Sequence, residues 1–156
     1  MTTIADKLQQ VQHRVAHACE RAGRDPASVL LLAVSKTFGP DAVLEAARAG
    51  QHAFGENYLQ EAVEKMAALR QMGAPTLQWH CIGPVQSNKT RLVAEHFDWM
   101  HTVDRLKVAQ RLSDQRPAHL PPLQVCIQIN VDGGANKSGV TPQEALALAQ
   151  SVAVLP

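Results

Sequence analysis

Six consecutive apolar residues stand at positions 29–34, between the turn Asp25-Pro26 and the polar segment Ser35-Lys36-Thr37. A run of this length without a polar side chain is typical of a strand that is buried on both faces, as the strands of parallel sheets are. Parallel strands need long crossover connections, which are usually helices. The run therefore predicts an α/β fold.

Strand and helix patterns alternate along the rest of the chain. The first helix is expected to be capped by Thr2 or Thr3 and to end at Gly23. The predicted strands cover residues 29–34, 52–54, 77–82, 99–103 and 123–131, and the helices after them begin near Pro40, Asn57, Ser87, Asp104 and Thr141. Five such units indicate a parallel sheet, either a (β/α)8 barrel or an open doubly wound sheet. The length of 156 residues by itself favours the open sheet, because a barrel usually needs about 250.

Lys36 stands where the first predicted strand ends. Burial at this position would remove water from the ammonium group and favour the uncharged amine, which attacks carbonyl groups and forms Schiff bases. Alternatively, Lys36 extends to the rim of the sheet and keeps its charge in water, which is the more common arrangement for a lysine. The strand alone leaves both interpretations open.

Other polar and glycine-containing segments also follow predicted strands. They are residues 54–58, 79–89 and 130–139. Ligand sites of α/β folds lie at the C-terminal ends of parallel strands. Each residue has a structural explanation too: Asn57 and Ser87 are good helix caps, His80 fits a core histidine, and Lys137 fits a solvated side chain. Their shared location at one rim is what favours a functional site.

Composition argues against several other classes of function. The formal net charge is +1 and the basic residues are scattered, so no global field attracts nucleic acid or an anionic membrane. The three cysteines form no C-x-x-C pair and are expected to be reduced thiols of a cytoplasmic protein. No apolar stretch reaches the roughly 18 residues of a membrane-spanning helix, and the start of the chain lacks a signal-peptide pattern. No metal site is predicted, because nothing completes a zinc set around His13 and His17.

Four motifs occur in order along the chain: Ala33-Val34-Ser35-Lys36-Thr37, Phe54-Gly55-Glu56-Asn57-Tyr58, Trp79-His80-x-Ile82-Gly83-x-x-Gln86-x-Asn88-Lys89, and Asn130-x6-Lys137-Ser138-Gly139. Together they resemble the YggS/PROSC family of pyridoxal phosphate homeostasis proteins. The resemblance implies a (β/α)8 TIM-barrel type of fold, like that of alanine racemase, with about five βα units after an N-terminal helix. Residues 1–156 would then form a single partial barrel domain without the sixth to eighth units.

The same resemblance implies a binding site for pyridoxal 5'-phosphate (PLP). Lys36 would hold PLP as an internal aldimine, and Asn57 would lie near the cofactor ring. Ile82, His80 and Gly83 would line the pocket. The implied function is PLP binding and intracellular PLP homeostasis without established catalysis. The expected partners are PLP and PLP-dependent apoenzymes, with no nucleic acid or membrane.

Two enzyme functions are alternatives to this one. The first is a PLP-dependent amino-acid racemase or lyase, and the second is a cofactor-free aldolase in which Lys36 attacks a substrate carbonyl. Catalysis at the α-carbon needs a second acid or base on the opposite face of the ring. Tyr58 is the only tyrosine and belongs to a helix-opening motif, so no clear second base is present and a carrier is favoured.

The chain departs from the family pattern in two ways. Many relatives have a glutamate three positions before the loop lysine, and here that position is Gly134. The chain also stops at Pro156, where the sixth strand would begin, and the family's phosphate cup lies beyond that point. We therefore expect weak PLP affinity, unpaired edges on the first and fifth strands, and self-association of this chain, although members of the family are often monomeric.

Overall fold

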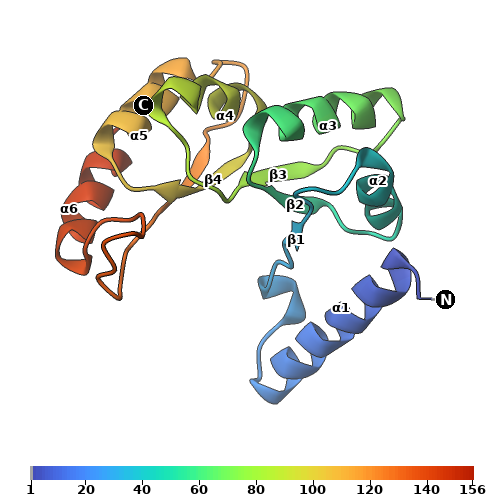
Figure 1. Cartoon of the computed structure of the whole chain (residues 1–156). Coiled ribbons are helices and arrows are strands. Elements are labelled where there is room, and N and C mark those ends of the chain that lie inside the picture. The colour runs from blue at the N-terminus through green and yellow to red at the C-terminus, as the bar shows by residue number, and fades with distance from the viewer. Residues whose placement is uncertain (1) are drawn as a thin grey trace. The chain divides into compact units, whose positions relative to one another are not determined.

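The computed structural model describes residues 2–156 (Figure 1). The chain divides into two compact units. The first unit contains the residues up to Gly55 together with Glu64–Gln78, and the second contains Glu56–Val63 and Trp79–Pro156. Helices and strands alternate along the chain, as the sequence predicts, and every strand pairing described below is parallel.

The first unit begins with helix α1 and holds a pair of short strands. Its elements are α1 (Ile4–Arg21), the 3₁₀ helix η1 (Pro26–Ser28), β1 (Ala33–Val34), α2 (Pro40–Arg48), β2 (Ala53–Glu56, without its last residue) and the larger part of α3 (Leu59–Gln71). Thr3 caps α1 in a capping box with Asp6, as expected for this residue type. Helix α2 packs against α1 and buries Val43 and Leu44.

Strand β1 is much shorter than the predicted strand over residues 29–34, and it is not buried on both faces. Only Ala33 and Val34 pair with β2, and Leu30 is 64% exposed. The side-chain amide of Gln51 donates to the carbonyl of Leu31 at 2.7 Å, so a side chain takes the place of a ladder partner there. The apolar run correctly predicted a strand at this place. The length of that strand depends on its pairing partners, and among residues 2–156 no strand pairs with the other edge of β1.

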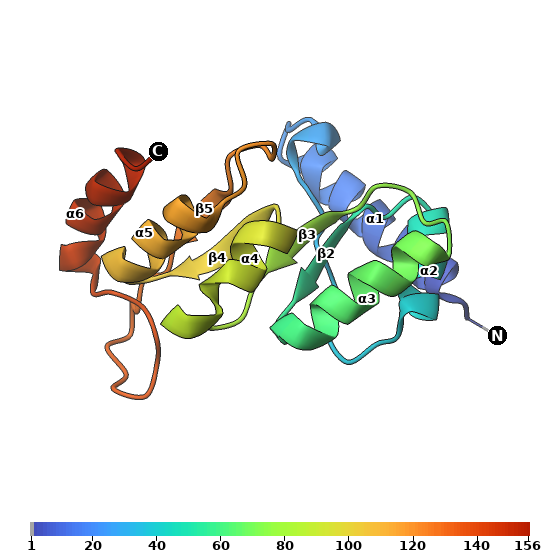
Figure 2. The ribbon, with the colours of Figure 1, turned by 90° about the horizontal axis from the view of Figure 1, so that it is seen from above.

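The second unit contains three parallel strands in sequence order. Its further elements are β3 (Gln78–Cys81, apart from its first residue), the 3₁₀ helix η2 (Ser87–Lys89), α4 (Thr90–His96), β4 (Trp99–Val103), α5 (Leu106–Gln115), β5 (Gln124–Ile127) and α6 (Pro142–Ala153). Helices α4 and α5 lie side by side (Figure 2), and their apolar faces bury Val93, Val108 and Leu112. Cys81 and Met100, which pair in register on β3 and β4, are completely buried.

Two predicted helix starts have different outcomes in this unit. Thr141 caps α6 in a capping box with Glu144, as the sequence indicates. Asp104 does not cap α5, which begins after Arg105 without a side-chain cap. The Asp104 carboxylate instead accepts the backbone N–H of Gly139 at 3.1 Å. A contact between residues distant in sequence has therefore replaced the expected local cap. Across residues 2–156, none of the helices combines the length and the apolar character needed to cross a bilayer.

Candidate functional site

Lys36 lies in a tight turn of the first unit, directly after β1. The turn closes with a hydrogen bond from the backbone N–H of Phe38 to the carbonyl of Ser35, at 3.1 Å. Ser35 itself is buried, and its N–H donates to the carbonyl of Gly55 on β2 at 2.9 Å. Thr37 has φ +67°, a left-handed conformation that a β-branched residue rarely adopts. The turn therefore presents Lys36 on a rigid and strained segment.

Of the two interpretations that the sequence left open for Lys36, the structure shows the solvent-exposed one. Lys36 is exposed, and so are Val34 and Phe38 beside it, which are 51% and 59% exposed. The physical reason is the short strand before it, since only β2 among the strands of residues 2–156 covers β1 along its edge. In this structure the Lys36 amine is accessible rather than dehydrated.

Asn57, Ile82 and Gly83 lie together in the second unit. The N–H of Ile82 donates to the carbonyl of Glu56 at 3.0 Å, which brings the end of β3 next to Asn57. A Cβ atom built on Gly83 would lie 3.0 Å from the carbonyl oxygen of Asn57 and 3.2 Å from its Cβ. Gly83 therefore allows the two backbone segments at Gly83 and Asn57 to lie close together, which the Cβ of a larger residue would prevent.

The side chain of Asn57 contains an unsatisfied polar atom. Its Oδ1 is buried and has no hydrogen-bond partner in the structure. Burying an amide oxygen without a donor costs roughly 1–3 kcal/mol, so native proteins rarely contain such atoms without a reason. The sequence offered helix capping as the structural explanation for Asn57, but the side-chain oxygen caps nothing here. A buried acceptor without a partner is suited to bind a ligand that carries an N–H or O–H group.

His80 belongs to an aromatic cluster on β3 and β4 rather than to the group around Asn57. Its ring stacks on Trp99 with centroids 5.4 Å apart, and its Nδ1 lies 2.8 Å from Nε2 of His101. Burial, followed by the nearby His101, lowers the pKa of His80 to about 4. His80 is thus a buried, partnered and neutral histidine, and its role toward a cofactor stays a prediction.

The loop over residues 130–139 is organised around Asn130. The Asn130 amide donates to the carbonyl of Gly134 at 2.9 Å, and its side-chain oxygen accepts the N–H of Gly133 at 3.1 Å. Lys137 is exposed, as predicted, and forms an ion pair with Asp132 that lowers the pKa of this carboxyl group. Asp132 therefore provides an acidic partner for Lys137. The loop borders a cavity of about 380 Å³ that also touches Ile82 and Thr102.

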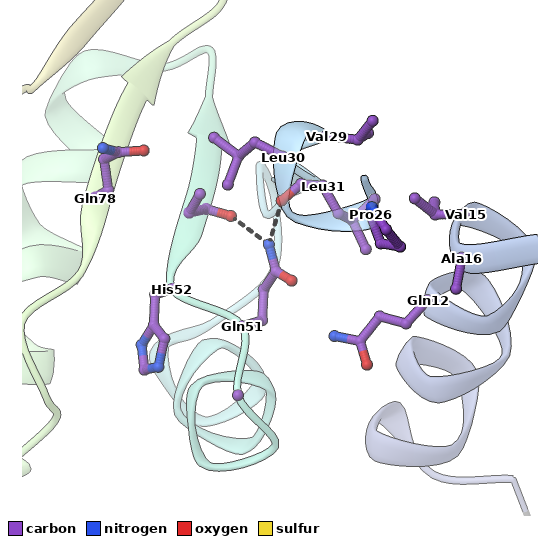
Figure 3. A pocket seen from close by; sticks show the side chains of 12 residues that line it. Gln12, Val15, Ala16, Pro26, Val29, Leu30, Leu31, Gln51, His52 and Gln78 are labelled. Atoms are coloured by element: carbon purple, nitrogen blue, oxygen red, sulfur yellow. Dashed lines mark hydrogen bonds between the residues drawn. The ribbon is translucent and has the colours of Figure 1, made fainter. Parts of the chain in front are cut away.

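A second cavity, of about 530 Å³, lies in the first unit between α1, the segment before β1 and β2 (Figure 3). It is lined mainly by apolar side chains, among them Val15, Val29 and Leu30. Gln51 also lines it, and its side-chain amide donates to the carbonyls of Leu31 and Ala53, at 2.7 and 2.8 Å. None of the predicted cofactor residues lines this cavity.

One residue near Lys36 was missed by the sequence analysis. Lys65 on α3 is only 4% exposed, and its Nζ donates to the carbonyl of Ser35 at 2.8 Å. A signal was present, because Lys65 interrupts the inner face of a helix that also buries Met66 and Leu69. A lysine at such a position needs a polar partner. Periodicity alone does not identify that partner, since it comes from a distant part of the chain.

Comparison with known proteins gives a consistent result. The family model described as "Alanine racemase, N-terminal domain" matches residues 7–156. A pyridoxal phosphate homeostasis protein of Pseudomonas aeruginosa is 59% identical over 156 residues, covering 100% of this chain and 66% of the relative. The protein of the same name from Escherichia coli strain K12 is 54% identical, with 100% and 67% covered. The chain belongs to the pyridoxal phosphate homeostasis protein family. It spans about two thirds of the length of these family members.

Solved structures agree with this family and with the predicted fold. PipY of Synechococcus elongatus PCC7942, solved with PLP bound, matches with a TM-score of 0.74 and 36% identity, over 91% of this chain and 65% of PipY. Alanine racemase of Corynebacterium glutamicum matches with a TM-score of 0.59 at 23% identity, over 82% of this chain and 36% of the racemase, which shows the fold alone. The prediction of an α/β fold of barrel type with five βα units is confirmed. That residues 1–156 form a single partial domain stays a prediction.

Proposed function

We propose that this chain binds PLP through Lys36 and takes part in PLP homeostasis inside the cell. The observation that supports this most strongly is the family membership, together with PLP bound to PipY. Lys36 lies in the first of the four motifs that carry the resemblance, and its amine is accessible at the end of β1. When bound, PLP supplies an aldehyde, which an amine captures reversibly as a Schiff base with the release of water.

The residues present suit such a cofactor. The turn around Lys36 is held by backbone hydrogen bonds from both Ser35 and Phe38, so the amine starts from a defined position. In the second unit, the buried Oδ1 of Asn57 lacks a donor, and Gly83 packs closely against Asn57. Asn57, Ile82, Gly83 and His80 keep the cofactor-binding roles that the resemblance implies, as proposals to be tested residue by residue.

A carrier fits the side chains better than a racemase does. A racemase needs a second acid or base on the opposite face of the cofactor ring. Tyr58, the only tyrosine, is 55% exposed, and burial raises the pKa of the Cys81 thiol to about 11. Neither group has the surroundings of an activated catalytic residue. We therefore propose reversible storage of PLP without turnover.

The test is to add PLP to the purified chain, record the visible spectrum, reduce with borohydride and map the modified peptide. We expect a mass increase confined to Lys36 and lost in Lys36→Ala. Lys7→Ala, which removes an exposed lysine of α1, is the matched control and should label like the wild type. Absence of the Lys36 adduct at any PLP concentration would overturn the proposal.

Two further measurements on the same purified chain test the enzyme alternatives. Steady conversion of an added amino acid by the PLP-loaded chain would indicate a racemase or lyase. Borohydride trapping of a sugar phosphate on Lys36, without trapping of PLP, would indicate an aldolase. Weak affinity, delivery of PLP to apoenzymes, self-association and the cytoplasmic location stay predictions. Dialysis of the loaded chain, transfer to an apoenzyme and light scattering test the first three.

A further inference from the structure

The carbonyl of Ser35 is the point at which the Lys36 turn is attached to α3. This oxygen accepts both the N–H of Phe38, at 3.1 Å, and the buried ammonium of Lys65, at 2.8 Å. The donors come from opposite directions along the chain, one from the end of the turn and one from a helix thirty residues away. The peptide group that precedes Lys36 is therefore fixed by a charged hydrogen bond, which is stronger than a neutral one.

The same turn contains the strained residue. Thr37 is the non-glycine residue with a positive φ within residues 2–156. A left-handed conformation is unfavourable for a residue with a Cβ, and such strain persists only where the surrounding structure enforces it. The hydrogen bond from Lys65 to Ser35 supplies an enforcing contact from outside the turn. Without it, the turn has less to oppose relaxation of Thr37 toward ordinary backbone angles.

We propose that Lys65 is a positioning residue for Lys36. By holding the Ser35 carbonyl, it keeps the strained turn closed and the Lys36 amine in the position from which it captures an aldehyde. This inference rests on the proposed function of Lys36, but the turn can be measured without any cofactor. It gives a reason for a lysine at a buried position where an apolar residue would pack without desolvation of a charge.

The first readout is amide hydrogen exchange at Phe38 in the unloaded chain, followed by NMR. In Lys65→Met we expect this amide to exchange about tenfold faster, because the variant loses the charged hydrogen bond that fixes the carbonyl acceptor of the amide. Lys65→Arg, which keeps a long charged donor, should restore protection. Lys7→Met is the control for loss of a lysine elsewhere in the first unit.

The second readout is the PLP concentration that half-labels Lys36 after borohydride reduction. Lys65→Met should raise this concentration about tenfold. In a Thr37→Gly background the turn is no longer strained. The same Lys65→Met change should then raise the half-labelling PLP concentration less than about threefold. This coupling separates a positioning role from a general loss of stability, which would be equal in both backgrounds. Melting curves ensure that all variants are compared while folded, and Lys65→Gln replaces Lys65→Met if the latter does not fold.

Equal losses in the two Thr37 backgrounds, or unchanged exchange of the Phe38 amide in Lys65→Met, would overturn the positioning role. If the wild type forms no Lys36 adduct, the proposed function fails, and the exchange measurement still decides whether Lys65 holds the turn. The two failures are therefore distinguishable.

Discussion

Nδ1 of His80 and Nε2 of His101 lie 2.8 Å apart, so one imidazole must donate a hydrogen and the other must accept it. At least one of the two rings therefore has to be neutral for the contact to exist. Burial lowers the pKa of both histidines, and the neighbouring His101 lowers the pKa of His80 further, to about 4. When both rings are protonated, two N–H groups and two positive charges face each other, and the hydrogen bond is replaced by a repulsion.

This pair predicts a loss of stability in mild acid. A histidine whose folded pKa lies below its ordinary value of 6.5 binds more protons when the chain is unfolded. The free energy of unfolding should therefore fall as the pH decreases from about 6.5 to about 4, by about 1–3 kcal/mol. Urea unfolding at a series of pH values measures the slope, and Trp99, which stacks on His80, is a fluorescent reporter beside the pair.

The variants for this prediction are His80→Gln and His13→Gln. His80→Gln removes the titrating ring and should flatten the slope between these pH values. His13 is exposed on α1, so His13→Gln should leave the slope as it is. The same slope in His80→Gln as in the wild type would assign the acid sensitivity to other groups.

Gly83→Ala should destabilise the chain and displace Asn57. The added methyl group would lie 3.0 Å from the Asn57 carbonyl oxygen and 3.1 Å from its Cα, both of them backbone atoms that yield little. Overpacking of this kind typically costs about 1–3 kcal/mol. Gly39→Ala is the control, because its Cβ meets nothing within 4 Å, and it should cost less than Gly83→Ala although Gly39 is the N-cap of α2. Equal urea midpoints for the two variants would contradict the close approach.

Local features of the fold were predictable, and those that depend on distant partners were not. The helix starts at Thr3, Pro40 and Thr141 follow from caps and proline preferences that act within a few residues. The strand at residues 99–103 matches the prediction to the residue. By contrast, the strand at 29–34 was predicted too long, since its extent depends on pairing with β2 rather than on its own apolar pattern.

The candidate site also shows this difference between features set locally and features set by distant residues. The family resemblance implied that Asn57 and Gly83 belong to one binding site, which stays a prediction, and the structure shows that the two residues pack closely against each other. The exposure of Lys36 was left open and the burial of Lys65 was not foreseen, because each is set by what packs on the residue from elsewhere in the chain. The prediction that Asp104 caps a helix failed for the same reason, because its partner in the structure, Gly139, is 35 residues away.

Thr37→Gly should make the unloaded chain more stable. Glycine adopts φ +67° without a Cβ clash, which removes about 1–2 kcal/mol of strain from the folded chain. Its extra freedom in the unfolded chain lowers the free energy of unfolding by about 0.5–1 kcal/mol, so a net gain remains. Thr37→Ala is the control, because it also loses the hydroxyl group but keeps the strained Cβ. Thermal melts should therefore rank Gly above Ala by about 1 kcal/mol, and the reverse order would show that the turn is not strained.

Asn57→Leu should separate stability from cofactor binding. Leucine has nearly the same shape but no oxygen, so it removes the buried Oδ1 that lacks a donor. Replacing an unsatisfied buried polar group by an apolar one is neutral or stabilising, and we expect the unloaded chain to gain up to about 1 kcal/mol in urea unfolding. If this oxygen is kept for a ligand, the same variant should need about tenfold more PLP to reach half of its full visible absorbance.

Asn57→Gln, which keeps the amide on a longer side chain, tests whether position matters as well as chemistry. A variant that gains stability and takes up PLP like the wild type would show that Asn57 has no part in binding. A variant that loses stability would show instead that the amide makes contacts essential to the second unit.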